Sequence, residues 1–297
     1  MTTSPWSERT LNLRVDGVDL RISAHSVPGP EPVVLLHGFG STKEEYADFS
    51  RFPGLAGHAF LAYDAPGFGA STSTRLDLVS IPFLVDVALA ALEQLGIDRF
   101  HVVDHSMGGL TALLLADRIP DRVLSFTDIE GNLAPEDCFL SRQIVTHHSD
   151  DPATFLADFA TRTRQADEYS SALYGSRVLT TVDPQVVRPV FESMVDMSDN
   201  GCLLAHFIGL PMPRMFMYGE QNAHLSYLPE LRRCGCALVE IEHSGHWPMF
   251  SNPPAMWTAL REFLVYSRLP ARSGPPKLAD LQASLEAEGQ EWDTRIA

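Results

Sequence analysis

The segment 102–109 constrains the fold of this chain more strongly than any other, because it reads Val-Val-Asp-His-Ser-Met-Gly-Gly. An apolar run ends there, a single serine follows, and a glycine-rich stretch then begins. This order is typical of a strained turn from a strand into a helix, where the pattern Gly-x-Ser-x-Gly presents a nucleophilic serine. Ser106 is therefore a candidate nucleophile. Asp104 stands where that pattern has its first glycine.

Apolar runs and helical patterns alternate along the rest of the chain. A hairpin is expected around Asp16-Gly17, between strands over 10–15 and 18–24. Further strands are expected over 33–36, 58–63, 99–103, 123–129, 214–218 and 237–241, and helices over 81–95, 107–118 and 254–266. Strands separated by helices predict an α/β protein with a doubly wound, mostly parallel sheet.

One long segment interrupts this alternation. Between Asn132 and Pro213 lie about eighty residues with helical patterns and no convincing strand, which is far longer than an ordinary loop. We therefore expect an inserted helical cap, with helices over 152–165 and 184–197. The predicted division is a core of 1–131 and 214–268, a cap of 132–213, and a tail of 269–297 with a peripheral helix over 278–288.

Composition excludes several classes of partner. The formal net charge of −16 argues against nucleic acid or an anionic membrane surface. The chain does not begin with a basic segment followed by an apolar run, and no stretch is long enough to span a bilayer. We therefore expect a cytoplasmic protein whose four cysteines are reduced thiols. Its partner is expected to be a small-molecule substrate, without cofactor or metal, and a homodimer is left open.

A histidine follows the last predicted strand, in the sequence His243-Ser244-Gly245-His246. The loop after a parallel strand returns to the edge of the sheet where Ser106 is expected. His246 can therefore reach Ser106 and act as general base and then general acid, since a serine hydroxyl needs a base to remove its proton. His243 follows the strand end too closely to be the better candidate.

The imidazole of such a pair needs an acid that orients it and stabilises its cation. The loop after the strand 214–218 reads Gly219-Glu220-Gln221-Asn222, where a Gly-x-x-Asp pattern is common, but residue 222 is Asn, so the position of the acid is vacant. Glu130 stands at the tip of the strand after the elbow, and we expect it to be the acid. Asp128, two residues deeper in that strand, is the alternative, and Glu130 could instead only cap the turn at Gly131.

A glycine-rich loop, His37-Gly38-Phe39-Gly40, follows the strand 33–36. Such a loop can direct the backbone N–H of Phe39 into the site, while the N–H of Met107 supplies a second donor. These two donors are the predicted oxyanion hole. The turn over 64–71, which reads Asp-Ala-Pro-Gly-Phe-Gly-Ala-Ser, is interpreted as architectural.

With these residues placed, residues 10–267 resemble the α/β-hydrolase fold family. The resemblance depends on the segments 37–40, 64–71, 105–109 and 244–246, in this order. It implies that the insertion is the helical cap of that family, lying over the site. In relatives such as certain haloalkane dehalogenases and zearalenone-type lactone hydrolases, the acid follows the strand after the elbow, as Glu130 does. Dehalogenases and epoxide hydrolases need a carboxylate nucleophile, so Ser106 sets these activities aside.

The expected activity is that of a cofactor-independent serine hydrolase that cleaves an ester or lactone through an acyl-enzyme. A small to medium hydrophobic substrate is expected, because the cap offers many apolar side chains. The alternatives are hydrolysis of a carbon–carbon bond in a diketone, and a non-catalytic receptor or binding protein on the same fold. The apolar cap residues considered as pocket lining are Phe139, Leu140, Phe155, Phe159, Tyr169, Leu173, Tyr174, Phe191 and Met194.

Overall fold

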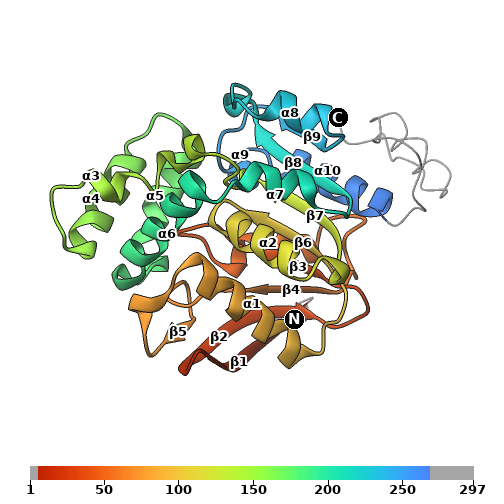
Figure 1. The fold of residues 1–297 in the computed structure, drawn as a ribbon, viewed down its shortest axis with the longest axis horizontal. Helices are drawn as coiled ribbons and strands as arrows, with labels where there is room; N and C mark the ends of the chain where they lie inside the picture. The colour runs from red at the N-terminus through yellow and green to blue at the C-terminus, as the bar shows by residue number, and fades with distance from the viewer. Residues whose placement is uncertain (1–5, 268–297) are drawn as a thin grey trace.

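The computed structural model describes residues 6–267, and within them nine strands form one sheet. Along the sheet the order is β1-β2-β4-β3-β6-β7-β8-β9, with β5 beside β2 (Figure 1). Pairing is antiparallel at β1–β2, β2–β4 and β2–β5 and parallel from β4 to β9. The strands are β1 Ser7–Val15, β2 Val18–Val27, β3 Val33–Leu36, β4 Phe60–Tyr63, β5 Thr72–Ser73, β6 Phe100–His105, β7 Val123–Ile129, β8 Arg214–Gly219 and β9 Ala237–Ile241.

Helices cover both faces of the sheet. In the view of Figure 1, α1 and α2 lie in front of it and α10 lies behind it, while α3 to α6 gather at one end of the molecule. The predicted mostly parallel α/β fold with helices inserted between β7 and β8 is confirmed. The helices are α1 Ile81–Leu95, α2 Met107–Arg118, α3 Gln143–Thr146, α4 Pro152–Arg164, α5 Tyr169–Thr181, α6 Val187–Asn200, α7 Leu203–Gly209, α8 Leu228–Arg233, α9 Pro248–Ser251 and α10 Pro253–Ser267.

Helix α1 begins and ends at the predicted residues because both ends carry clear capping groups. The Ser80 hydroxyl accepts a hydrogen bond from the N–H of Phe83. At the other end Gly96 adopts a left-handed φ of 65°, and its N–H donates to the carbonyl of Glu93. Helix α2 also has its predicted bounds, since it starts directly after Ser106.

Other boundaries differ from the prediction. Strand β6 continues to His105, two residues beyond its predicted end, because the polar residues Asp104 and His105 are buried and paired with a neighbouring strand. The helix expected over 184–197 is a 3₁₀ turn over 184–186 followed by α6, which reaches Asn200. Helices α3, α5, α7, α8 and α9 and the short strand β5 were not predicted, because they are short or lack a clear apolar period.

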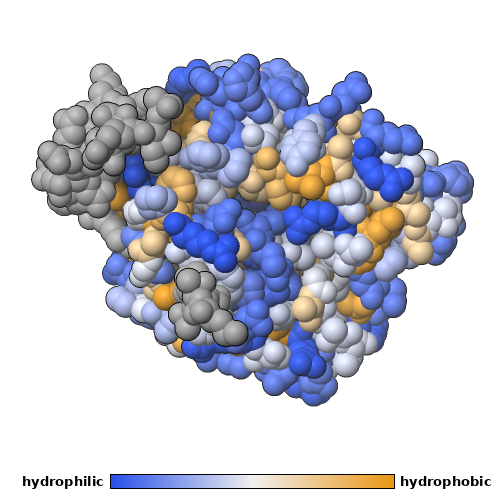
Figure 2. Space-filling view, turned by 180° about the vertical axis from the view of Figure 1, so that it is seen from behind, coloured by the Kyte–Doolittle hydropathy of each residue, from blue (hydrophilic) through white to orange (hydrophobic). Residues whose placement is uncertain are grey.

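The surface of the described part is mostly hydrophilic on the face shown in Figure 2, where hydrophobic residues form small, separated groups. Between residues 6 and 267, no helix combines the length and the apolar character needed to cross a bilayer. The tail predicted over 269–297, with its helix over 278–288, lies outside the described residues.

Close packing of α2 against β3 depends on Gly108. A Cβ atom added at Gly108 would overlap the backbone carbonyl oxygens of Leu36 and His37, which cannot rotate away as a side chain can. We expect Gly108→Ala to lower the free energy of unfolding by about 1–3 kcal/mol, the usual cost of overpacking. Urea denaturation measures this, with Gly209→Ala as the control, because no atom lies within 4 Å of a Cβ added at Gly209. Equal stability of both variants would contradict the prediction.

Candidate active site

Ser106 lies between the end of β6 and the start of α2, in a strained conformation with φ 52° and ψ −114°. Its N–H donates to the carbonyl of Ile129 at 3.1 Å, and its own carbonyl accepts from the N–H of Gly109 at 2.8 Å. Positive φ is uncommon for a residue with a side chain, and it is found where function requires it. The turn thus holds the hydroxyl of Ser106 at the carboxyl edge of the parallel strands.

His246 lies in the loop after β9 and contacts Ser106. The hydroxyl of Ser106 donates to Nε2 of His246 at 3.1 Å, and Nδ1 of His246 lies 3.5 Å from Oε2 of Glu130. A further hydrogen bond, from Nε2–H of His105 to the carbonyl of His246 at 2.8 Å, holds the loop. Burial lowers the pKa of His105 well below its usual value, so this ring is neutral.

Glu130 directly follows β7, and its carboxylate is held from two directions. Oε1 accepts from the N–H of Gly219 at 2.6 Å, and Oε2 accepts from the side-chain amide of Asn222 at 2.8 Å. The backbone of Glu130 has φ 54°, and its N–H donates to the carbonyl of Met217 at 3.0 Å. Asn222, which stands where an acid is common, therefore donates a hydrogen bond to Glu130 at the end of the neighbouring strand. The sequence did not predict this role of Asn222.

The structure brings Ser106, His246 and Glu130 together and keeps the other candidates apart. Asp128 is buried, and its Oδ1 accepts from the N–H of Gly131 at 2.6 Å rather than facing His246. His243 is exposed, and its Nδ1 lies 3.8 Å from a carboxylate oxygen of Glu220.

The two backbone donors predicted to stabilise an oxyanion belong to residues near Ser106: Met107 follows it in the chain, and Phe39 lines the same cavity. Neither the N–H of Phe39 nor that of Met107 has a hydrogen-bond partner within residues 6–267. Met107 is the first residue of α2, where N–H groups carry the positive end of the helix dipole. The carbonyl of Phe39 accepts from the hydroxyl of Tyr174 at 2.9 Å, which ties this loop to the cap.

A buried ion pair next to the loop 37–40 was not predicted from the sequence. Nζ of Lys43 lies 2.9 Å from Oδ2 of Asp64, and Oδ1 of Asp64 accepts from the N–H of Lys43 at 2.8 Å. The N–H of Ala65 donates to Nε2 of His37 at 2.9 Å. These bonds join the turn 64–71 to the loop that carries Phe39, as its architectural interpretation implies. No short motif marks Lys43, so only the fold reveals the pair.

The space above Ser106 is almost closed, with a cavity of about 20 Å³, roughly enough for one water molecule. Five of the nine apolar residues considered as lining contribute: Phe139, Leu140, Tyr174, Phe191 and Met194. The expectation fails for the others: Phe155 and Phe159 are buried in the core of the cap, Tyr169 is 72% exposed, and Leu173 does not line this cavity.

A second cavity, of about 270 Å³, lies on the other side of His246. Asp137, Phe139 and His246 line both cavities, and the rings of Phe139 and His246 meet edge to face with centroids 5.1 Å apart. Phe139 is 51% exposed, and its ring lies where the outer cavity and the cavity above Ser106 adjoin. Other residues that line the outer cavity are Glu130, Glu136, Asn222, His224 and Leu225.

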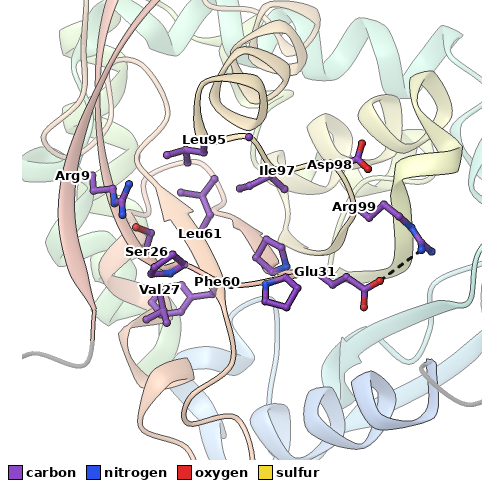
Figure 3. A pocket seen from close by; sticks show the side chains of 15 residues that line it. Arg9, Ser26, Val27, Glu31, Phe60, Leu61, Leu95, Ile97, Asp98 and Arg99 are labelled. Atoms are coloured by element: carbon purple, nitrogen blue, oxygen red, sulfur yellow. Dashed lines mark ion pairs between the residues drawn. The ribbon is translucent and has the colours of Figure 1, made fainter.

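Two further features lie away from this chemistry. A cavity of about 360 Å³ adjoins Ser26, the start of β4 and the end of α1, at the opposite edge of the sheet from Ser106, and its Arg99 pairs with Glu31 at 3.6 Å (Figure 3). In the cap, donor atoms of His147, His148 and Asp158 lie within 4.8 Å of one another. Nε2 of His147 is already 3.2 Å from Oδ2 of Asp158, an interaction that accounts for their proximity without a metal.

Comparison with known proteins places most of the chain in one family. A model described as the alpha/beta hydrolase family matches residues 33–259. Among curated proteins, a 2-hydroxy-6-oxononadienedioate/2-hydroxy-6-oxononatrienedioate hydrolase of Burkholderia vietnamiensis is 35% identical over 130 residues, which are 41% of this chain and 43% of the relative. The matched segment thus spans less than half the length of that relative.

Solved structures resemble this chain over nearly its whole length. The match to a structure from a study of carboxylesterases of Nitrososphaera gargenis has a TM-score of 0.71 and 17% identity, and covers 87% of this chain and 98% of the other. The match to the structure of an N-acyl homoserine lactonase has a TM-score of 0.68 and 18% identity, and it covers 90% of this chain and 99% of the other. At such low identity these likenesses show the fold alone.

Because residue 222 is an amide, Glu130 has no second carboxylate beside it, and we expect a carboxylate at this position to make stability depend on pH. In Asn222→Asp a second carboxylate would face Oε2 of Glu130, raising the pKa of one of the two acids. A raised pKa in the folded state contributes stability that is present below the unfolded pKa and is lost as pH rises. We therefore expect the unfolding free energy of Asn222→Asp to fall, relative to wild type, as pH increases from about 4 to 8.

Urea denaturation at each pH tests this expectation. Asn222→Ala loses only a hydrogen bond to a charged group, about 1.5–3 kcal/mol, and should show no added pH dependence. Asn200→Asp is the matched control, because the amide of Asn200 donates to Asp196 at 2.8 Å on the exposed surface. If the Asn200 and Asn222 variants respond equally to pH, the prediction is wrong.

Proposed function

This chain belongs to the alpha/beta hydrolase family, and on that premise we propose that it is a serine hydrolase of neutral carboxylic esters or lactones. The observation that carries the proposal is the chain of contacts from Ser106 through His246 to Glu130, with distances of 3.1 Å and 3.5 Å. Nucleophile, base and orienting acid in hydrogen-bond reach are the signature of an activated serine.

In the proposed reaction, Nε2 of His246 takes the proton of Ser106 while its Oγ attacks the carbonyl carbon of the substrate. The negative charge that develops on the carbonyl oxygen is stabilised by the free N–H groups of Phe39 and Met107. Glu130 stabilises the imidazolium that forms. His246 then gives its proton to the leaving alkoxide, which completes the acyl-enzyme, and water repeats the sequence to release the acid.

The charge of the cavity linings favours neutral substrates. Neither the cavity above Ser106 nor the outer cavity is lined by Lys or Arg, whereas Glu130, Glu136 and Asp137 contribute acids. Burial raises the pKa of Asp137 to about 6, so this carboxyl is mostly ionised at pH 7. A substrate carboxylate would meet like charge and would find no guanidinium or ammonium partner.

Hydrolysis of a carbon–carbon bond is the second candidate, because the Burkholderia relative is a hydrolase of an oxo-dienedioate. The name of that substrate denotes two carboxylates, which the linings here do not complement. We therefore place esters and lactones first, and a diketone second only in a neutral form. The names of the solved neighbours, which include carboxylesterases and a lactonase, agree with this order.

Covalent labelling tests whether the serine reacts. A fluorophosphonate probe should label the wild type and leave Ser106→Ala unlabelled, while Ser176→Ala, an exposed serine of α5, labels normally. Turnover of p-nitrophenyl butyrate should fall by about 10⁴-fold in Glu130→Gln, as when the acid of a serine triad becomes an amide. Glu192→Gln on the surface of α6 is the control for that change.

Three outcomes would count against the proposal. Absence of labelling of the wild type would favour a receptor or binding protein. Equal labelling of Ser106→Ala would show that another residue reacts. Undiminished turnover by Glu130→Gln would show that Glu130 is not the acid and would return Asp128 to consideration.

Substrate charge gives a separate prediction. The kcat/KM for p-nitrophenyl butyrate should exceed that for the p-nitrophenyl monoester of succinate by at least about tenfold, because the second substrate brings an unpaired carboxylate beside an acidic lining. Added salt should reduce the difference in kcat/KM between the two esters, because it screens the acidic lining. The variant Glu136→Gln should also reduce this difference, whereas Glu192→Gln should leave it unchanged. Equal rates for both esters, or faster cleavage of a neutral β-diketone, would refute the assignment to neutral esters.

A further inference from the structure

Asp104 and Asp128 lie side by side beneath the turn that carries Ser106, although neither takes part in the reaction above. They are paired residues in the parallel register of β6 and β7, so their side chains leave the sheet on the same face. Both are at most 1% exposed. That face packs on α2, because a Cβ added at Gly109 would lie 3.0 Å from Oδ1 of Asp104 and 3.3 Å from Oδ1 of Asp128.

Only one of the four carboxyl oxygens accepts a hydrogen bond of good geometry from the described residues. Oδ1 of Asp128 accepts from the N–H of Gly131 at 2.6 Å. Oδ2 of Asp128 and both oxygens of Asp104 are buried without a hydrogen-bond partner among the described residues. Two ionised carboxylates in this position would repel each other and would both lack solvation, so the arrangement requires a proton.

We propose that Asp104 and Asp128 hold one proton between them, that the carboxyl of Asp104 donates a hydrogen bond to Asp128, and that the pair positions Glu130. The inference rests on the proposed role of Glu130 as the acid of the site. Asp104 and Asp128 act as positioning residues, since neither lines the cavity above Ser106 or the outer cavity.

The link to Glu130 is the tight turn at the end of β7. Asp128 binds the N–H of Gly131, the residue directly after Glu130, while Glu130 itself has a left-handed backbone with φ 54°. A Cβ added at Gly131 would overlap the carboxyl of Asp128, so the turn is packed directly on that side chain. A change in the charge or place of Asp128 must therefore move the backbone that carries the acid.

The same cluster reaches the start of α2. A Cβ added at Gly109 would lie 2.7 Å from Cα of Gly131, so helix, carboxyl pair and turn are in direct contact. Met107, whose N–H is a proposed oxyanion donor, begins that helix. Asp104 and Asp128 thus occupy the space between two parts of the site that must keep a fixed separation.

The charges around the pair favour retention of the proton. Burial, and then the charge of Asp128, raise the pKa of Asp104 well above its usual value, while the nearby N–H of Ile129 opposes this shift. Burial raises the pKa of Asp128 to about 7, while the N–H of Gly131 opposes this shift. The other titratable groups that act on the pair or feel its charge are acids, phenols and a thiol: Glu130, Asp137, Tyr46, Tyr227 and Cys236.

The variant Asp104→Asn distinguishes a shared proton from a role in packing alone. Its side chain has nearly the same size, but its amide can donate to Asp128 at every pH. In the wild type the folded pKa values of this pair are raised. The stability that the pair contributes is therefore fully present only below the usual pKa of a carboxyl, and it is lost as pH rises. We expect the unfolding free energy of the wild type to fall as pH rises from about 4, the usual pKa of a carboxyl, to about 7, and that of Asp104→Asn to fall less. Asp121→Asn, an exposed change, is the control and should follow the wild type.

Infrared spectroscopy and kinetics complete the test. The carbonyl band of a protonated carboxylic acid should be stronger at pH 7 in the wild type than in Asp104→Asn. For p-nitrophenyl butyrate, Asp104→Ala should lower kcat by about 10²-fold with little change in KM, the usual cost of displacing a site by about 1 Å. Asp104→Asn should rescue kcat and remain active on the alkaline side, where the wild type declines.

The outcomes distinguish this proposal from the proposed function. Identical infrared spectra and identical pH dependence of stability in the wild type and Asp104→Asn would overturn the shared proton. An active enzyme in which Asp104→Ala keeps the wild-type kcat would overturn the positioning role. A wild type that is inactive on all esters, yet shows the carboxylic acid band and its loss in Asp104→Asn, would contradict the esterase activity and support the shared proton.

Discussion

The parallel pairing of β6 with β7 is the constraint on which the rest of the site depends. It places Asp104 opposite Asp128 and His105 opposite Ile129, so the strands end together. The chain then leaves both strands with positive φ, at Ser106 and at Glu130. A shift of one residue in this register would turn every side chain to the other face and separate nucleophile from acid.

The cap completes this arrangement by closing it. The hydroxyl of Tyr174 in α5 binds the carbonyl of Phe39, and the hydroxyl of Thr181 binds that of Gly40 at 2.6 Å, so two polar contacts attach the cap to the oxyanion loop. Exclusion of water strengthens electrostatic interactions inside a site. The nearly closed cavity above Ser106 therefore suits charge stabilisation by backbone N–H groups.

Most strands and helices, and the position of Ser106, could be predicted because the residues that determine them are close together in the sequence. A capping serine and a left-handed glycine fixed α1, and the turn after β6 marked Ser106. The contacts of Asn222 and Lys43 could not be predicted in the same way, since their partners lie far along the chain: Asn222 donates to Glu130, and Lys43 pairs with Asp64. Contacts of that kind depend on strand order, which no short segment encodes.

Asp104 and Asn222 at first look like two unrelated departures from a common pattern, but charge connects them. The acid of the site follows β7, so Glu130 lies two residues beyond the buried Asp128. A further carboxylate at 222 would contact Glu130, and an ionised Asp104 would face Asp128, in a region where the described neighbours offer the pair no cation. An amide at 222 and a proton on the Asp104–Asp128 pair each remove one negative charge. What remains at the tip of β7 is the single carboxylate of Glu130, the charge that one imidazolium at His246 can balance.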